Sequence, residues 1–364
     1  MTVQDVINHL EELAPLAQAE DFDNVGLLVG SKNTEVTGIL VCLDTLEAVV
    51  EEAIDKNCNF ILSFHPIIFK GLKSLTGKTY VERTVLKAIQ NNIAIYAIHT
   101  ALDKVHHGVN DIICNRLQLA DRQILLPQKS TISKLQFYVP STHTAQVKTA
   151  LFKAGAGNIG NYDHCSFSFK GEGTFRGNAL SNPTIGQAGE MEKVSETAVA
   201  VTFNKYQQEP ILKALFTAHP YEEVAYEVST LDNANQNVGM GMIGRLKEPM
   251  PSGSFLKFAK ERLQSPMLRH SALVKNKIER VAVLGGSGSF AISAAKRAKA
   301  DVFITADLKY HDFFRAEKEM ILADVGHYES EQFTKSFLVD YLSKKITNFA
   351  IILSNTNTNP VKYL

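Results

Sequence analysis

Histidine and carboxylate side chains stand at the ends of short apolar runs in this 364-residue sequence. His65 follows the run FILSF, and His327 follows the run MILADVG with Glu331 four residues after it. If a helix begins there, His327 and Glu331 share one face of it. Imidazole and carboxylate ligands without a thiolate suit a hydrolytic Zn²⁺, Mn²⁺ or Fe²⁺ site. The residues of this kind at run ends are His65, His99, Asp103, Asp307, His327 and Glu331.

Each single histidine has an ordinary alternative, a hydrogen-bonded place in the protein core. The strands and helices predicted around these histidines and carboxylates favour a shared site instead. Apolar runs alternate with amphipathic segments, which predicts parallel strands covered by helices on both faces of a sheet. Ligands bind beyond the carboxyl ends of such strands. The predicted strands are 38–44, 60–64, 93–99, 280–285, 301–305, 320–326 and 349–354, and the helices between them are 45–57, 79–91, 108–118, 289–299, 308–319 and 329–344.

A middle segment has a different pattern. After a predicted linker over 120–134, strands and helices follow in the order βαββαβ, which is typical of a ferredoxin-like fold. Within it the segment HCSFSFKGEGTFRG (164–177) is expected to form a hairpin around Gly171 and Gly173. We therefore predict an α/β fold in which two parallel-sheet halves, 1–130 and 236–364, form one discontinuous domain, with an inserted α+β module at 131–235.

Composition limits the classes of function. Lys+Arg and Asp+Glu both number 38, and there is no dense basic run of the kind that nucleic-acid binding needs. The N-terminus lacks the apolar core of a signal peptide, and no apolar run approaches the roughly 20 residues of a membrane span. The four cysteines form no C-x-x-C pair, as expected for reduced thiols. We expect a soluble, cytoplasmic protein without membrane partners.

Six ordered segments resemble the signatures of the NIF-three-like family, whose members are known as dinuclear metal-centre proteins or GTP cyclohydrolase I type II homologs. The resemblance covers nearly the whole chain, and two middle segments, AGAGNIGNYDHCSFS (154–168) and AHPYEEVAYEV (218–228), resemble the module of the longer members. The six segments are DNVGLLVG (23–30), SFHPIIF (63–69), HTALD (99–103), GGSGSF (285–290), TADLKYHD (305–312) and DVGHYESE (324–331).

The resemblance implies one or two divalent ions per chain, Zn, Mn or Fe. By motif, His65 and Asp103 hold one ion, His327 holds the other, and Glu331 bridges both. The resemblance also implies a ring-shaped homohexamer. Metal identity and the true substrate stay open.

Two positions depart from the family pattern. Phe64 stands where the family usually has the first of two consecutive histidines, and Ala306 stands where a glycine is common. Because phenylalanine cannot bind a metal ion, we expect unequal sites, with one ion held firmly and the other weakly or not at all.

The leading hypothesis is a metal-dependent hydrolase of the GTP cyclohydrolase type, in which metal-activated water attacks a nucleotide-like substrate. His99, Asp307 and His311 are candidate catalytic residues that would move protons. Lys309 is a candidate contact for a substrate phosphate, although it equally suits a solvated surface. Gly286 and Gly288 could present backbone N–H groups to an anion.

Two alternative hypotheses assign the protein to other functional classes. Gly286, Gly288 and Ala291 fit the permissive G-x-G-x-x-A pattern, with Asp307 placed 19 residues after Gly288, which would suggest NAD. The other is a non-enzymatic metal-binding regulator or scaffold whose inserted module mediates assembly or senses a small ligand. In that module His219, beside Glu222 and Glu223, is another possible ligand, but the sequence favours a solvated turn between helix and strand there.

Overall fold

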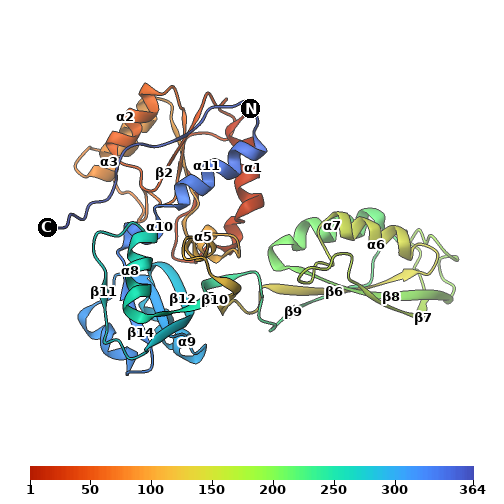
Figure 1. Ribbon diagram of the computed structural model, residues 1–364. Helices are drawn as coiled ribbons and strands as arrows, with labels where there is room; N and C mark the ends of the chain where they lie inside the picture. The colour runs from red at the N-terminus through yellow and green to blue at the C-terminus, as the bar shows by residue number, and fades with distance from the viewer. The chain divides into compact units, whose positions relative to one another are not determined.

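The computed structural model describes all 364 residues of the chain (Figure 1). The chain divides into two compact units, one of Met1–Leu126 with Asn237–Leu364 and the other of Pro127–Gln236. The sequence predicted breaks after residues 130 and 235. No helix combines the length and apolar character needed to cross a bilayer.

The first sheet of the discontinuous unit has the order β1-β4-β3-β2-β15. β15, β2, β3 and β4 run parallel, and β1 pairs antiparallel with β4. Every residue of the three central strands is buried, which explains their continuous apolar sequence. The strand predicted at 349–354 belongs here, although the prediction grouped it with the C-terminal strands. The bounds are β1 Gly26–Val29, β2 Ile39–Cys42, β3 Phe60–Ser63, β4 Ala94–Ala97 and β15 Ile351–Leu353.

The second sheet has the order β11-β14-β13-β12-β10-β5. Its centre, β12 to β14, is parallel, and β10 and β11 pair antiparallel with their neighbours. The predicted linker at 120–134 is wrong, because β5 occupies most of it and β6 of the module begins at Ile132. The bounds are β5 Ala120–Pro127, β10 Gly239–Pro251, β11 Arg269–His270, β12 Lys277–Ser287, β13 Val302–Ala306 and β14 Ile321–Asp324.

The helices of this unit differ from prediction in two places that matter for the site. The helix predicted at 329–344 is two helices, and the first begins at His327. The helix predicted at 308–319 is a 3₁₀ segment that ends where Glu317 adopts a left-handed conformation. The helices are α1 Val3–Leu13, η1 Leu16–Gln18, α2 Glu47–Asp55, α3 Tyr80–Gln90, α4 His99–Lys104, α5 Val109–Arg116, α8 Ser252–Arg262, η3 Ser289–Ala291, α9 Ile292–Arg297, η4 Tyr310–Ala316, α10 His327–Glu331 and α11 Thr334–Lys345.

One hydrophobic core joins the two sheets. Val41, Leu62 and Tyr96 from the first sheet belong to the same buried cluster as Val283 and Ile304 from the second. Because both sheets pack into this core, side chains at the carboxyl ends of their parallel strands can reach one another. The discontinuous unit therefore positions its candidate site between two sheet edges.

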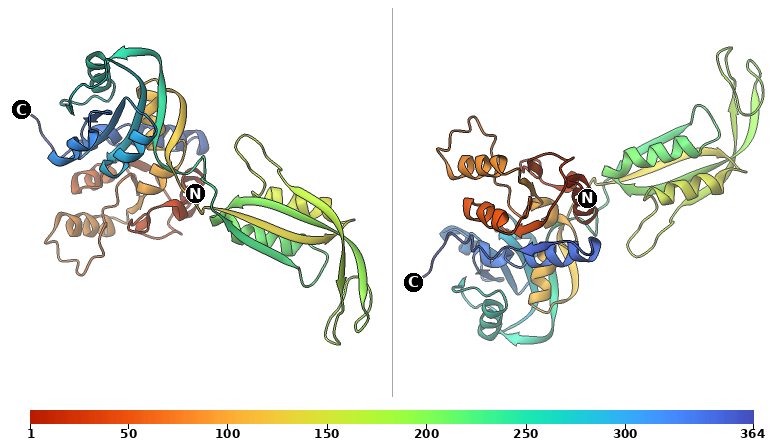
Figure 2. Two further views of the ribbon diagram at one scale, coloured as in Figure 1. Left: turned by 90° about the horizontal axis from the view of Figure 1, so that it is seen from below. Right: turned by 90° about the horizontal axis from the view of Figure 1, so that it is seen from above.

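The unit Pro127–Gln236 has the predicted βαββαβ order, and its antiparallel sheet has the order β7-β8-β6-β9. Figure 2 shows α6 and α7 on the same face of this sheet. The hairpin predicted around Gly171 and Gly173 is wrong, because β7 runs straight through both glycines and pairs with β8 along its length. The bounds are β6 Ile132–Pro140, α6 Thr144–Lys153, β7 Phe167–Phe175, β8 Glu192–Asn204, η2 Lys205–Gln207, α7 Gln208–Ala218 and β9 Tyr226–Leu231.

Candidate metal centre

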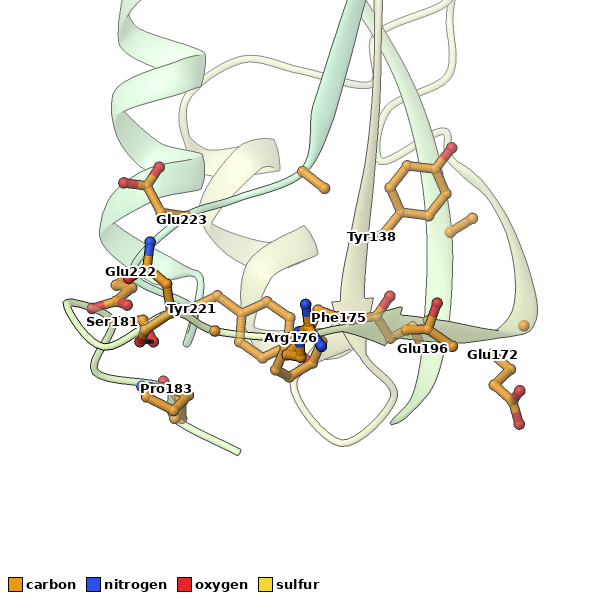
Figure 3. A pocket seen from close by; sticks show the side chains of 18 of the residues that line it. Tyr138, Glu172, Phe175, Arg176, Ser181, Pro183, Glu196, Tyr221, Glu222 and Glu223 are labelled. Atoms are coloured by element: carbon orange, nitrogen blue, oxygen red, sulfur yellow. Dashed lines mark hydrogen bonds between the residues drawn. The ribbon is translucent and has the colours of Figure 1, made fainter. Parts of the chain in front are cut away.

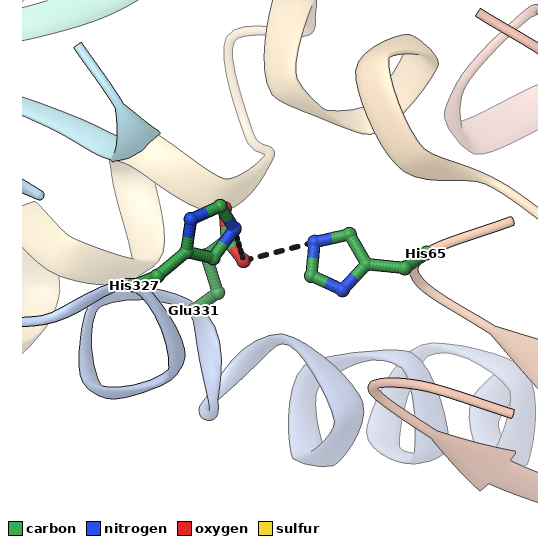
Figure 4. Close-up of side chains that lie close together, drawn as sticks. All are labelled: His65, His327 and Glu331. Atoms are coloured by element: carbon green, nitrogen blue, oxygen red, sulfur yellow. Dashed lines mark ion pairs between the residues drawn. The ribbon is translucent and has the colours of Figure 1, made fainter. Parts of the chain in front are cut away.

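Three predicted ligands converge at the carboxyl ends of β3 and β14. His65 Nε2 and His327 Nε2 each lie 3.2 Å from Glu331 Oε2 (Figure 4). The ligand atoms of these three residues all lie within 4.8 Å of one another. Glu331 is 3% exposed, so its carboxylate meets the two imidazoles in a place largely closed to solvent.

Backbone contacts fix both histidines. The His65 N–H donates to the Leu43 carbonyl, which extends the pairing of β3 and β2 beyond the strand end. Gly326 has φ 93°, a conformation that glycine adopts readily, and it turns the chain from β14 into α10 at His327. The four-residue spacing on α10 then brings His327 and Glu331 onto one face, as the sequence predicted.

A carboxylate holds the far side of each imidazole. His65 Nδ1 lies 2.8 Å from Asp44 Oδ1, and His327 Nδ1 lies 2.7 Å from Asp307 Oδ2. A carboxylate in this position accepts the Nδ1 proton and leaves Nε2 for a metal ion. Thr358 Oγ1 donates to the second oxygen of Asp44 at 2.6 Å, so the C-terminal segment supports His65 indirectly.

The site concentrates charge out of water. Burial disfavours protonation of His65, but Glu331 and Asp44 outweigh it and raise its pKa to about 10. His327 is likewise partly desolvated, and Asp307 and Glu331 raise its pKa to about 11. Burial disfavours ionisation of Glu331, yet His65 and His327 lower its pKa to about 2. The cluster therefore requires positive charge at Nε2, which protons or a metal ion can supply.

Asp103, the fourth predicted ligand, is half-buried near the same cluster, with its Oδ1 closed to solvent, but does not belong to the converging group. Burial and the Glu331 carboxylate raise the pKa of Asp103 well above its ordinary value. Asp103 Oδ1 and Glu331 Oε2 are both buried without a hydrogen bond of good geometry. Orphaned oxygens of this kind fit a site that a cation completes.

His99 lies beside the cluster, with its ring centroid 5.1 Å from that of His65. Its Nδ1 lies 2.9 Å from Asp23 Oδ1, and Asp23 also accepts hydrogen bonds from the backbone and hydroxyl of Thr100. Despite burial, the bonds to His99 and Thr100 lower the pKa of Asp23 to about 2. The arrangement gives His99 a fixed orientation with Nε2 free of any hydrogen bond in the chain.

The other predicted site residues have different surroundings. The Gly286 N–H donates to Ser330 Oγ at 2.9 Å, and a Cβ at Gly286 would lie 2.4 Å from Glu331 Oε1. A Cβ at Gly288 would lie 2.1 Å from Thr305 Oγ1. Both glycines thus permit close packing around the cluster. Lys309 is exposed directly before η4, and His311 is exposed within it, where the His311 ring packs near Tyr310 and Phe314.

Sequence reasoning missed Asp44, Asp23 and Thr358. Asp44 ends the predicted strand 38–44, and Asp23 opens the segment DNVGLLVG, so the sequence pattern could have identified both as site residues. Thr358 follows the last strand in a polar stretch, and no sequence pattern marks it as a site residue. A cleft of about 440 Å³ adjoins the cluster, lined in part by Asp44, His65, Arg269, Asp307 and His327.

Exchanging either supporting carboxylate should weaken metal binding. Asp44→Asn and Asp307→Asn leave the Nε2 ligands in place but remove the charge that orients each imidazole. We expect the affinity for Zn²⁺ or Mn²⁺ to fall about 10–100-fold in each variant. Titration against a chelator of known affinity measures this. Thr358→Val, which removes only the support of Asp44, should have a smaller effect, and unchanged affinity in both Asn variants would contradict the assigned roles.

Phe64 lies in the hydrophobic core and not on the wall of the cleft. It is 0% exposed, and its ring meets that of His99 edge-on with centroids 5.5 Å apart. Phe64→His should therefore cost about 2–4 kcal/mol of unfolding free energy, because it removes buried apolar surface and buries a polar ring. Urea denaturation measures the loss.

The same variant should raise the metal content towards two ions per chain. Phe64→Leu is the matched control, since it perturbs the core without adding a ligand. Two firmly held ions in the unmodified protein would show that another side chain already replaces the missing histidine.

Known proteins resemble the chain over its whole length. The model of the Duf34/NIF3 (NGG1p interacting factor 3) family matches residues 1–360. A "GTP cyclohydrolase 1 type 2 homolog" of Bacillus subtilis is 36% identical, covering 99% of this chain and 98% of that protein. A namesake from Halalkalibacterium halodurans is 37% identical with the same coverage.

Solved structures agree with these sequence relatives. The crystal structure of a Bacillus cereus protein related to NIF3 has a TM-score of 0.87 and 36% identity, covering 100% of this chain and 99% of that one. Staphylococcus aureus protein SA1388 has a TM-score of 0.79 and 30% identity, with the same coverage.

Proposed function

Because the chain belongs to the Duf34/NIF3 family, we propose that it binds a divalent metal ion and acts as a metal-dependent hydrolase of a nucleotide-like substrate. The observation that carries the proposal is the convergence of His65 Nε2 and His327 Nε2 on Glu331 Oε2. Two imidazole nitrogens and a carboxylate oxygen form a donor set that Zn²⁺, Mn²⁺ and Fe²⁺ all accept.

The residues around this set have distinct tasks. His65, His327 and Glu331 would hold the ion, and Asp103 would complete its ligands from the buried side. A bound divalent ion would act as a Lewis acid that lowers the pKa of water, which is the chemistry of metal-dependent hydrolysis. If a second ion binds, His327 would serve that ion instead, as the family resemblance implies, and Glu331 would be shared between the two.

His99 is the proposed proton acceptor beside the site. Asp23 accepts the proton of His99 Nδ1, which leaves the lone pair of Nε2 free to take a proton from a reacting group. Asp307 instead orients His327, so a supporting task suits it better than the proton transfer first proposed for it.

The substrate class rests on the adjoining cleft and on the names of the relatives. Arg269 is the one guanidinium or ammonium group in the lining, and it donates to the Leu308 carbonyl at 2.8 Å while pairing with Asp324. A single cation is enough to bind one phosphate group, whereas an extended polyphosphate would also need a metal ion.

We include the homohexamer in the proposal, and light scattering of the purified protein measures the number of chains in the assembly.

The test uses the full chain stripped of metal and reloaded with Zn²⁺, Mn²⁺ or Fe²⁺ in turn. GTP is the first probe, and chromatography with formate analysis detects opening of the purine ring. Turnover that requires metal and is lost in His65→Ala would support the hydrolase. Metal binding without turnover of GTP or of other purine nucleotides would favour the non-enzymatic regulator or scaffold.

A further inference from the structure

A second cavity, of about 720 Å³, lies wholly within the unit Pro127–Gln236. Its lining comes from β6, β7, β8, the segment after β7 and the segment before β9, so it uses no residue of the metal centre. Figure 3 shows the side chains that surround it.

Two glycines leave space at the cavity wall formed by β7. Side chains alternate along a strand, so Phe169, Gly171, Gly173 and Phe175 share one face of β7. A Cβ at Gly171 would meet nothing within 4 Å, whereas a Cβ at Gly173 would lie 2.1 Å from Glu196 Oε2. Glycine inside a strand often marks a place where a ligand approaches the backbone. The β7 strand thus provides an open place at Gly171 with a carboxylate next to it.

Aromatic side chains stand around this open place. Tyr138 and Phe169 line one part of the cavity, and Phe175 and Tyr221 line another, with their ring centroids 5.8 Å apart. Burial and the neighbouring Glu196 raise the pKa of Tyr221, so its phenol stays protonated and can donate a hydrogen bond. The Tyr221 hydroxyl is buried without a hydrogen-bond partner of good geometry. Such a lining suits a flat, polar ring.

The charged side chains of the lining indicate which groups of a ligand they would bind. Glu196 is half-buried and has no cationic partner, while the other lining carboxylates, Glu172, Glu222 and Glu223, are exposed. Arg176 also lines the cavity and makes no ion pair. A carboxylate accepts two adjacent N–H donors at once, and a guanidinium binds an anionic group.

We propose that this cavity binds a planar heterocycle that presents adjacent N–H donors along one edge and carries an anionic group. The ring packs over Gly171 among the aromatic side chains, its N–H edge faces Glu196, and its anionic group pairs with Arg176. Guanosine 5′-monophosphate (GMP) has all these features and is the probe. Its N1–H and exocyclic amino group are the adjacent donors.

The test is calorimetric titration of the full chain carrying Glu331→Gln, with EDTA present. This background removes metal-dependent binding at the other site, so the result is independent of the proposed hydrolase. We expect GMP to bind, AMP to bind at least about 10-fold more weakly because its ring nitrogen N1 is an acceptor, and IMP to lie between them.

Three further substitutions locate the binding. Glu196→Gln and Arg176→Ala should each weaken GMP binding about 10-fold or more. Gly171→Leu fills the open place and should abolish binding, and a thermal unfolding scan of each variant verifies folding. Glu209→Gln is the matched control, because Glu209 is an exposed carboxylate on α7 of the same unit and does not line the cavity; GMP binding to this variant should be unchanged.

The absence of GMP binding at millimolar concentration would overturn the proposal, as would binding that survives Gly171→Leu. Hydrogen exchange supplies a third outcome. Protection of β7 that rises with protein concentration, without GMP, would show that a second copy of the chain covers the cavity, and this would also overturn the proposal.

Discussion

Glu331→Gln is expected to reduce metal affinity by more than about 100-fold, which is a larger loss than we expect from either supporting carboxylate. Glu331 Oε2 is the one oxygen that both His65 Nε2 and His327 Nε2 approach, at 3.2 Å each. Glutamine keeps the volume but replaces the anionic bridge by a neutral amide. Metal analysis after dialysis, together with titration of the metal-free protein, measures the loss.

Glu329→Gln is the control for this substitution. Glu329 lies on the same helix and is equally buried, but its Oε1 accepts a hydrogen bond from Asn359 Nδ2 at 2.9 Å. The Glu329→Gln variant should retain the metal. Without metal, Glu331→Gln should also lower the unfolding free energy by about 1–3 kcal/mol, because it removes the buried carboxylate that pairs with the partly exposed His65 and His327 imidazolium groups. Full metal content in Glu331→Gln would contradict the assignment of the bridging ligand.

The sequence predicted the central parallel strands well because each is a continuous apolar run. β2, β3 and β4 are buried at every position, so periodicity and burial agree there. The sequence missed β5, which it predicted as a linker, and it predicted the strand β15 but grouped it with the wrong sheet. Pairing of β15 with β2 joins residues more than 300 positions apart, and no local pattern encodes that choice.

The candidate site likewise contains residues that the sequence could predict and residues that it could not. His65, His327 and Glu331 could be predicted because strand ends and a four-residue spacing are local signals. The placement of Phe64 could not, because the residue before His65 lies either on the cleft wall or in the core according to how helices and strands pack around it. Gly171 and Gly173 misled the hairpin prediction for a related reason. Glycine indicates either a turn or an open strand face, and only the pairing with β8 decides between them.

Metal affinity is expected to rise about 100-fold for each pH unit between pH 7 and 9. The pKa values of His65 and His327, raised to about 10 and 11, mean that both imidazoles carry a proton in the metal-free protein over this range. Each must release that proton before Nε2 can bind an ion, so binding releases two protons. Histidines with an ordinary pKa near 6.5 would already be neutral at pH 8 and would give almost no dependence.

Calorimetric titration with Mn²⁺ in buffers of different ionisation enthalpy counts the released protons directly. Release of a third proton would identify Asp103 as a ligand, because burial raises its pKa well above the ordinary value. The same shifts give the metal-free protein a stability that is complete below pH 6.5 and falls as the pH rises towards 10 and 11, since the folded state then binds more protons than the unfolded state. Metal should suppress this fall, because a bound ion replaces the protons between the imidazoles and Glu331. Affinity and stability that are both flat from pH 7 to 9 would contradict the charge arrangement on which the metal centre depends.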